Sequence, residues 1–133
     1  MEAAQRYLEA KERYTVGSEH WAQATAAAFD MLRLEACAEV AKPEWWNDEG
    51  LKALSARVVR AAPNDAVANY MRALVLSGRS RDAWEAGPRW AAELREAAAY
   101  FDRSAALCDA PAKKAECATD ADWCRSQAQM AVS

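Results

Sequence analysis

Three cysteines near the end of the chain are the first residues whose types could do chemistry. Cys108, Cys117 and Cys124 are separated by nine and seven residues, and the last two would share one face of a helix. A structural zinc site needs four ligands and usually contains a closely spaced cysteine pair, which is missing here. The only histidine, His20, lies far away in the sequence. The spacing therefore favours small buried thiols over a metal or redox site, and we expect no cofactor.

Acid–base and nucleotide chemistry also lack suitable residues. A single histidine, His20, is available as a general base, and no nucleophile and orienting group accompany it in the sequence. Two carboxylate pairs occur at spacings typical of solvated helix faces: Glu35 with Glu39, and Asp120 with Asp122. The chain has no phosphate-binding loop, no dinucleotide fingerprint and no HExxH motif. The sequence therefore indicates a protein that is not an enzyme.

Tryptophan and arginine side chains are the best candidates for binding. Six tryptophans are many for 133 residues, and several stand in expected connections rather than on helix faces. Such side chains either fill gaps under a connection or line a groove, since tryptophan and arginine are favoured at binding hot spots. The segment 79–90, RSRDAWEAGPRW, fits that composition best, although arginine could also stack on indole within it. Its candidate binding residues are Arg79, Arg81, Trp84 and Trp90.

The composition of the chain predicts an all-α protein in one domain, 1–133. Alanine and other strong helix formers are abundant, glycine and proline number four each, and no run alternates long enough for a strand. The net charge of −3, with acids and bases interspersed, argues against binding to nucleic acid or to a membrane surface. No stretch is apolar enough for a membrane-spanning helix, and the charged start resembles no signal peptide. We therefore expect a cytoplasmic protein.

Apolar periodicity, capping residues and breakers predict six helices. Ser18 is expected to cap the second helix, Asn47 or Asp48 the third, and a Pro-Asn-Asp turn at 63–65 separates the third from the fourth. Gly78 is expected to end the fourth helix, and a loop with a short helical turn should follow it over 79–90. The expected helices span residues 2–14, 19–40, 49–62, 66–77, 91–108 and 112–130.

The predicted helix 66–77 is apolar on nearly all sides. Only Asn69 and Arg72 interrupt it, so we expect it at the centre of the domain. The two polar residues either form a solvent-facing edge of this helix or face a ligand.

Residues 51–109 resemble tetratricopeptide repeats, a family that stacks antiparallel helix pairs. AAPNDAVANYMRALVLSG resembles a repeat boundary and a first helix, with Pro63 as the closing proline and Ala73 as the small contact residue. REAAAYFDRSAALCD resembles a second helix, with Ala97 as the small residue and Phe101 as the large one. The chain departs from the family pattern at Arg72, where a large apolar residue is usual, and through the insert 79–90.

The resemblance implies stacked antiparallel helical hairpins, a tetratricopeptide-like α-solenoid fragment, with a closed helical bundle as the alternative. In that family the first helices line a groove that grips extended peptides, so Asn69 and Arg72 would face a ligand. We therefore predict a non-enzymatic module or scaffold that binds a protein or peptide. The alternatives are a self-associating unit, which would bury the connection tryptophans in a homo-oligomer contact, and, less favoured, a helical protein that binds a small molecule.

Overall fold

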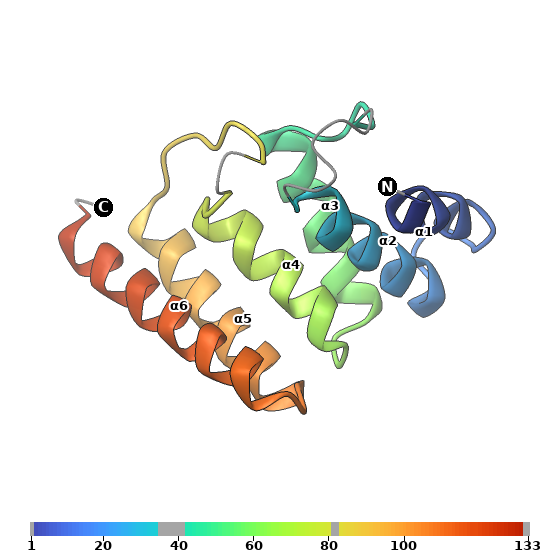
Figure 1. The fold of residues 1–133 in the computed structure, drawn as a ribbon. Helices are drawn as coiled ribbons and strands as arrows, with labels where there is room; N and C mark the ends of the chain where they lie inside the picture. The colour runs from blue at the N-terminus through green and yellow to red at the C-terminus, as the bar shows by residue number, and fades with distance from the viewer. Residues whose placement is uncertain (1, 35–41, 81–82, 132–133) are drawn as a thin grey trace.

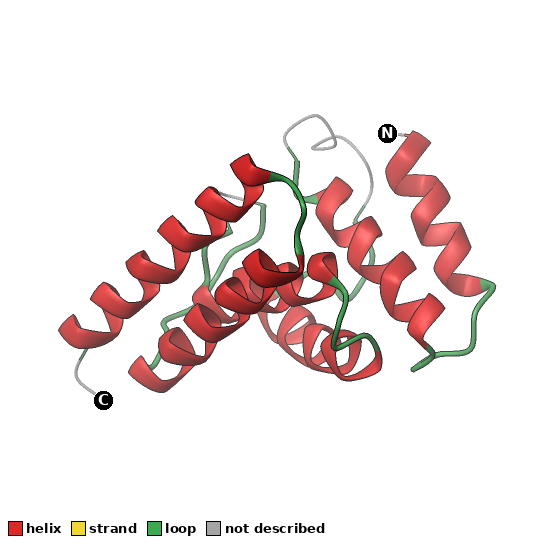
Figure 2. Cartoon of the chain, turned by 90° about the horizontal axis from the view of Figure 1, so that it is seen from below, coloured by secondary structure: helices red, strands yellow, loops and turns green. Residues whose placement is uncertain are grey.

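The computed structural model describes residues 2–34, 42–80 and 83–131. Within these ranges the chain forms six helices and no strand, which confirms the predicted all-α class. Figure 1 shows the helices in chain order across the molecule, from α1 on one side to α6 on the other. The first and last helices lie far apart in this view and in the turned view of Figure 2. None of the helices in the described ranges has the length and apolar character needed to cross a bilayer.

Five of the six helices begin and end within two residues of the predicted positions. The exception is the second helix, which was predicted to reach residue 40 but ends at Leu32, with Arg33 as its C-cap. Neither glycine nor proline marks this end, since the first proline after Leu32 is Pro43. The rest of that predicted segment, 35–40, lies outside the described residues. The helices are α1 (Glu2–Glu12), α2 (Glu19–Leu32), α3 (Asp48–Ala61), α4 (Ala66–Ser77), α5 (Ala91–Leu107) and α6 (Pro111–Met130).

Three helices begin with a side chain that accepts a hydrogen bond from a backbone N–H three residues later. These caps are Ser18 at α2 (3.1 Å), Asn47 at α3 (2.8 Å) and Asp65 at α4 (2.9 Å). The sequence predicted all three helix starts, and the structure selects Asn47 over Asp48 at α3. Gly78 ends α4 in the left-handed conformation, with φ of 72°.

Helix α4 occupies the centre of the molecule, as its apolar sequence predicted. Each helix packs against the next helix in the chain, and α2 also packs against α4. Helix α4 therefore contacts α2, α3 and α5, and it lies in the middle of the view in Figure 1. The main core combines side chains from five helices, including Phe29, Leu51, Met71, Phe101 and Cys124.

An aromatic cluster fills the space beneath the connections that precede α3 and follow α4. The Phe29 ring lies 5.4 Å from Trp46 and 5.8 Å from Trp84, measured between ring centroids, and the two indoles meet edge to face at 6.1 Å. The Trp46 indole N–H donates to the Ala83 carbonyl at 2.8 Å. Trp84 is only 7% exposed. These contacts support the gap-filling interpretation for Trp46 and Trp84.

A partly buried ion pair fastens the insert 79–90 to the start of α3 and the end of α4. The two terminal nitrogens of Arg89, Nη2 and Nη1, lie 2.6 and 2.9 Å from the carboxylate oxygens of Asp48. Arg89 also donates to the carbonyls of Leu76 and Val75 in the last turn of α4, each at 2.8 Å. The Arg89 side chain is 6% exposed. One guanidinium therefore links three segments through charge-assisted hydrogen bonds.

Asp48 is surrounded by hydrogen-bond donors. Besides Arg89, the Trp84 indole N–H lies 3.0 Å from Oδ1 and the Gly87 backbone N–H 3.1 Å from Oδ2. Burial by itself raises the pKa of Asp48, but these donors and the Arg89 charge outweigh it and lower the pKa from 3.8 to about 2. The insert is thus held by side-chain contacts. Residues 81–82 of the insert lie outside the described ranges, so the short helical turn expected there stays a prediction.

We expect Gly78→Ala to lower the free energy of unfolding by about 1–2 kcal/mol. Its positive φ disfavours a side chain, and an added Cβ would lie 3.3 Å from Nε of Arg89, which the ion pair holds in place. Gly17→Ala is the matched control, because Gly17 has φ of 91° but no atom near the added Cβ. Urea unfolding compares the two variants. Equal decreases in the free energy of unfolding would show that the Arg89 side chain moves aside at little cost.

Candidate functional site

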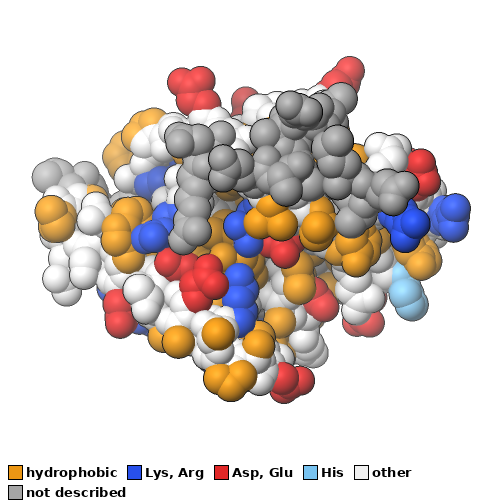
Figure 3. Space-filling view, in the orientation of Figure 1, with side chains coloured by type: hydrophobic (Ala, Val, Ile, Leu, Met, Phe, Trp, Pro, Cys, Tyr) orange, Lys and Arg blue, Asp and Glu red, His pale blue; other side chains and the backbone are white. Residues whose placement is uncertain are grey.

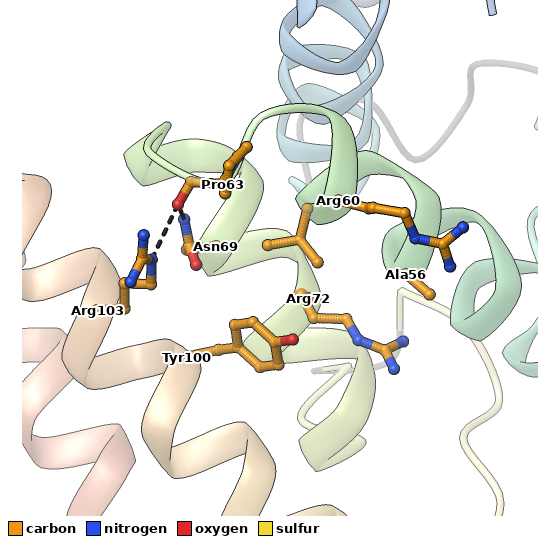
Figure 4. Close-up of a pocket in the computed structure, with 8 residues that line it drawn as sticks. Ala56, Arg60, Pro63, Asn69, Arg72, Tyr100 and Arg103 are labelled. Carbon is orange, nitrogen blue, oxygen red and sulfur yellow. Dashed lines mark hydrogen bonds between the residues drawn. The ribbon is translucent and has the colours of Figure 1, made fainter. Parts of the chain in front are cut away.

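A groove of about 480 Å³ lies over α4, between α3 and α5. Figure 4 shows Asn69 and Arg72 on α4 in the middle of the groove, with α3 and α5 on opposite sides. The α3–α4 turn closes one end through Pro63. The groove is lined by Ala56, Val59, Arg60, Pro63, Asn69, Arg72, Tyr100 and Arg103.

The lining of the groove is cationic. It contains three arginines and no aspartate or glutamate, although the chain as a whole has a net charge of −3. Arg60 is exposed and forms no hydrogen bond or ion pair within the described part of the chain. On the face of the molecule seen in Figure 3, by contrast, acidic and basic side chains are interspersed. The groove therefore has a cationic lining on a chain that is acidic overall.

Asn69 is fully buried at the floor of the groove. Its Nδ2 donates to the carbonyls of Pro63 (3.0 Å) and Asp65 (2.8 Å), so both amide hydrogens are used. Two carbonyl neighbours can only face the NH₂ group, and this fixes the orientation of the amide. The other end, Oδ1, is buried and has no hydrogen-bond partner. Figure 4 shows this oxygen on the side of the amide turned away from Pro63.

Arg72 is held partly by its own chain. Its Nη1 donates to the Lys52 carbonyl at 2.8 Å and to the Ser55 hydroxyl at 3.0 Å, both on α3. Its Nε is buried and has no partner. Asn69 and Arg72 therefore do not form the solvent-facing edge of α4 that was one of the two alternatives predicted for them. Each residue uses part of its hydrogen-bonding capacity within the protein and keeps one buried polar atom unpaired.

The groove also contains three residues that were not predicted from the sequence to bind a partner: Arg60, Tyr100 and Arg103. Arg103 donates from Nε to the Pro63 carbonyl and from Nη2 to Asn64 Oδ1, each at 2.9 Å, which leaves Nη1 without a bond. Tyr100 is half-buried and extends from α5 toward Arg72 in Figure 4. The spacing of Tyr100 and Arg103 repeats that of the predicted pair on α4. Only the packing of α5 on α4 brings the two pairs together.

Among the described insert residues that were predicted to bind a partner, none lines this groove: Arg79, Trp84 and Trp90 all lie outside it. Trp84 is buried in the aromatic cluster, whereas Trp90 caps α5 and is 68% exposed. The Arg79 guanidinium lies 4.2 Å from the centroid of the Trp123 ring on α6. Arg81 lies outside the described residues. The insert therefore contributes mainly to packing, and its tryptophan–arginine composition reflects internal contacts at Trp84 and Arg79.

The late cysteines lie in or near the core. Cys117 and Cys124 are buried and Cys108 is half-buried. Burial raises the pKa of both buried thiols, that of Cys124 to about 11, so both are protonated at neutral pH. No three histidine, cysteine, aspartate or glutamate side chains lie close enough to hold a metal ion in the described ranges. Cys37 lies outside those ranges.

Comparisons with known proteins provide no relative for this chain. A scan against protein-family models found no match, and searches of curated proteins and of solved structures found none either. The functional inference therefore depends on the geometry and charge of the groove.

Proposed function

We propose that this protein is a non-enzymatic interaction module whose groove over α4 binds an acidic segment of a protein or peptide partner. The observation that carries the proposal is the convergence of Arg60, Arg72 and Arg103 on a groove with no acidic lining residue. Arginine is favoured at interfaces because its planar guanidinium can bind a carboxylate through two hydrogen bonds.

The stacked-hairpin arrangement is part of the same proposal. Each helix packs on its neighbour in sequence, and the two small residues of the tetratricopeptide resemblance, Ala73 and Ala97, are fully buried. Helices α1 and α6 lie at opposite ends of the molecule, which favours an open stack over a closed bundle. Self-association through the connection tryptophans has less support, because Trp46 and Trp84 are engaged within the chain.

We expect Arg60→Gln to weaken peptide binding about tenfold, because it removes one charge-assisted hydrogen bond to the ligand. Arg60 is exposed and unpaired, so the stability of the protein should change little. The ligand would come from selection of a random peptide library against the protein. Its affinity for each variant would be measured by fluorescence anisotropy at low and physiological salt.

Arg95→Gln is the matched control for this experiment. Arg95 is exposed on α5 but does not line the groove, so its substitution makes the same change in net charge elsewhere. The proposal requires acidic residues to be enriched in the selected peptides and the affinity to depend on Arg60 far more than on Arg95. Equal losses in the two variants, or selected peptides without acidic residues, would contradict it.

A further inference from the structure

Two exposed arginines of the groove have donors to spare, and they stand on opposite walls. Arg60, on α3, forms no hydrogen bond or ion pair within the described part of the chain. Arg103, on α5, uses Nε and Nη2 within the chain, but its Nη1 has no partner among the described residues. Figure 4 shows the two guanidiniums apart, one on each side of the groove. A single carboxylate therefore cannot pair with both.

The two arginines flank the same end of α4. Arg60 belongs to the last turn of α3, and the short connection 62–65 joins this turn to the start of α4. Arg103 donates to the Pro63 carbonyl and to Asn64 Oδ1 in the same connection, each at 2.9 Å. A ligand that lies along the groove therefore meets the two positive charges at about the same level, one on each side.

An extended peptide matches this arrangement through the geometry of its side chains. Successive side chains of an extended chain point to opposite sides, whereas residues i and i+2 point to the same side. Adjacent residues can therefore reach the two walls from one level of the groove. A helix about 10 Å across would fill the groove volume of about 480 Å³ within about one turn. The size of the groove thus favours an extended segment.

We infer that the groove recognises two consecutive acidic residues of an extended peptide, one paired with Arg60 and the other with Arg103. Each carboxylate binds its own guanidinium through charge-assisted hydrogen bonds. Arg72 adds positive charge between the walls, while its Nη1 stays bonded to Lys52 and Ser55 of α3. This inference rests on the proposed function and specifies the ligand, because it requires a particular spacing of the acidic residues.

Peptides of equal length, composition and net charge test the spacing. Each contains two aspartates in a host of alanine and serine, either adjacent or separated by one, two or three residues. By fluorescence anisotropy we expect the adjacent pair to bind about tenfold more tightly than the pair separated by one residue, whose carboxylates face the same wall. Tightest binding by any other spacing, or equal affinity across the series, would overturn the inference.

Substitution of each arginine assigns the two aspartates to the two walls. The adjacent-aspartate peptide is compared with versions in which one or the other aspartate is replaced by asparagine. In Arg60→Gln we expect one replacement to cost little and the other still about tenfold, and in Arg103→Gln we expect the two roles to be exchanged. Peptides are compared within one protein variant, so its stability does not affect the result. Arg95→Gln, outside the groove, should leave both replacements at about tenfold.

The pattern of these losses decides whether the two walls act separately. Dependence of both arginine variants on the same aspartate, or equal dependence on both aspartates, would overturn the inference, because a diffuse positive charge would then bind the peptide. Acidic residues enriched in the selected library peptides, with affinity that depends on Arg60, would in that case still support the proposed function. The two failures are therefore distinguishable.

Discussion

Arg89→Ala is expected to lower the free energy of unfolding by about 3 kcal/mol or more. The substitution removes both bonds to the Asp48 carboxylate and the bonds to two carbonyls in the last turn of α4. Asp48 is then left as a partly buried charge, because its side chain is 19% exposed. Removal of one partner from such a pair costs more than the pair contributes in net terms, since the remaining charge stays desolvated.

Urea unfolding followed by circular dichroism measures this loss, with Arg95→Ala as the control on an exposed surface of α5. Acid pH provides a second readout. The folded pKa of Asp48, about 2, lies below its ordinary 3.8, so its contribution is complete above about pH 4 and is lost as the pH falls towards 2. This contribution is roughly 2 kcal/mol, and Asp48→Asn should remove its pH dependence. A loss in Arg89→Ala no larger than in Arg95→Ala would show that the ion pair does not fasten the insert.

Trp84→Ala is expected to cost about 3–4 kcal/mol of stability, whereas Trp90→Ala should change it by less than about 0.5 kcal/mol. The two tryptophans lie six residues apart in the same insert and have the same side chain. Trp84 is 7% exposed, packs on Phe29 and Trp46, and donates to Asp48. Trp90 is 68% exposed.

Thermal and urea unfolding of both variants measures these losses of stability. The unfolding is followed by far-ultraviolet circular dichroism, because each variant lacks a tryptophan that would contribute to a fluorescence signal. Each variant should also be tested with the selected peptides. Trp90→Ala is the useful control, because it removes an indole without opening a cavity. A stable Trp84→Ala protein with weakened peptide binding would reverse the assignment and return Trp84 to the binding surface.

Local features of the fold could be predicted because local chemistry determines them. Ser18, Asn47 and Asp65 cap helices through side-chain bonds that span three residues, and Gly78 ends α4 because it can adopt a positive φ. The end of α2 could not be predicted in this way. Leu32 is followed by neither glycine nor proline, so the apolar stripe gave no reason to stop there.

Long-range pairing explains the other differences. Asp48 and Arg89 are 41 residues apart, and nothing in the sequence indicates that they meet. When the contact between Asp48 and Arg89 is not known, a segment rich in tryptophan and arginine looks like a binding surface by its composition. Its arginine and indole side chains serve equally well to anchor a loop. In the structure Trp84 and Arg79 make contacts within the chain, whereas Trp90 is exposed and its role in binding stays a prediction.

Only some of the groove residues could be predicted, again because long-range packing brings the others together. Asn69 and Arg72 stood out as the polar residues of an apolar helix, and the structure places both in the groove. Arg60 and Arg103 lie on the polar faces of other helices, where arginine is ordinary. Their convergence depends on how α3 and α5 pack on α4, which no spacing within one helix reveals.

The most direct test of the binding surface is a map of backbone amide shifts in the isotope-labelled protein on addition of the tightest selected peptide. We expect the largest shifts on residues 56–60 of α3, 69–72 of α4 and 100–103 of α5, and we expect them to diminish in Arg60→Gln. Largest shifts on α6 around Trp123 and Met130, with the groove residues unmoved, would contradict it.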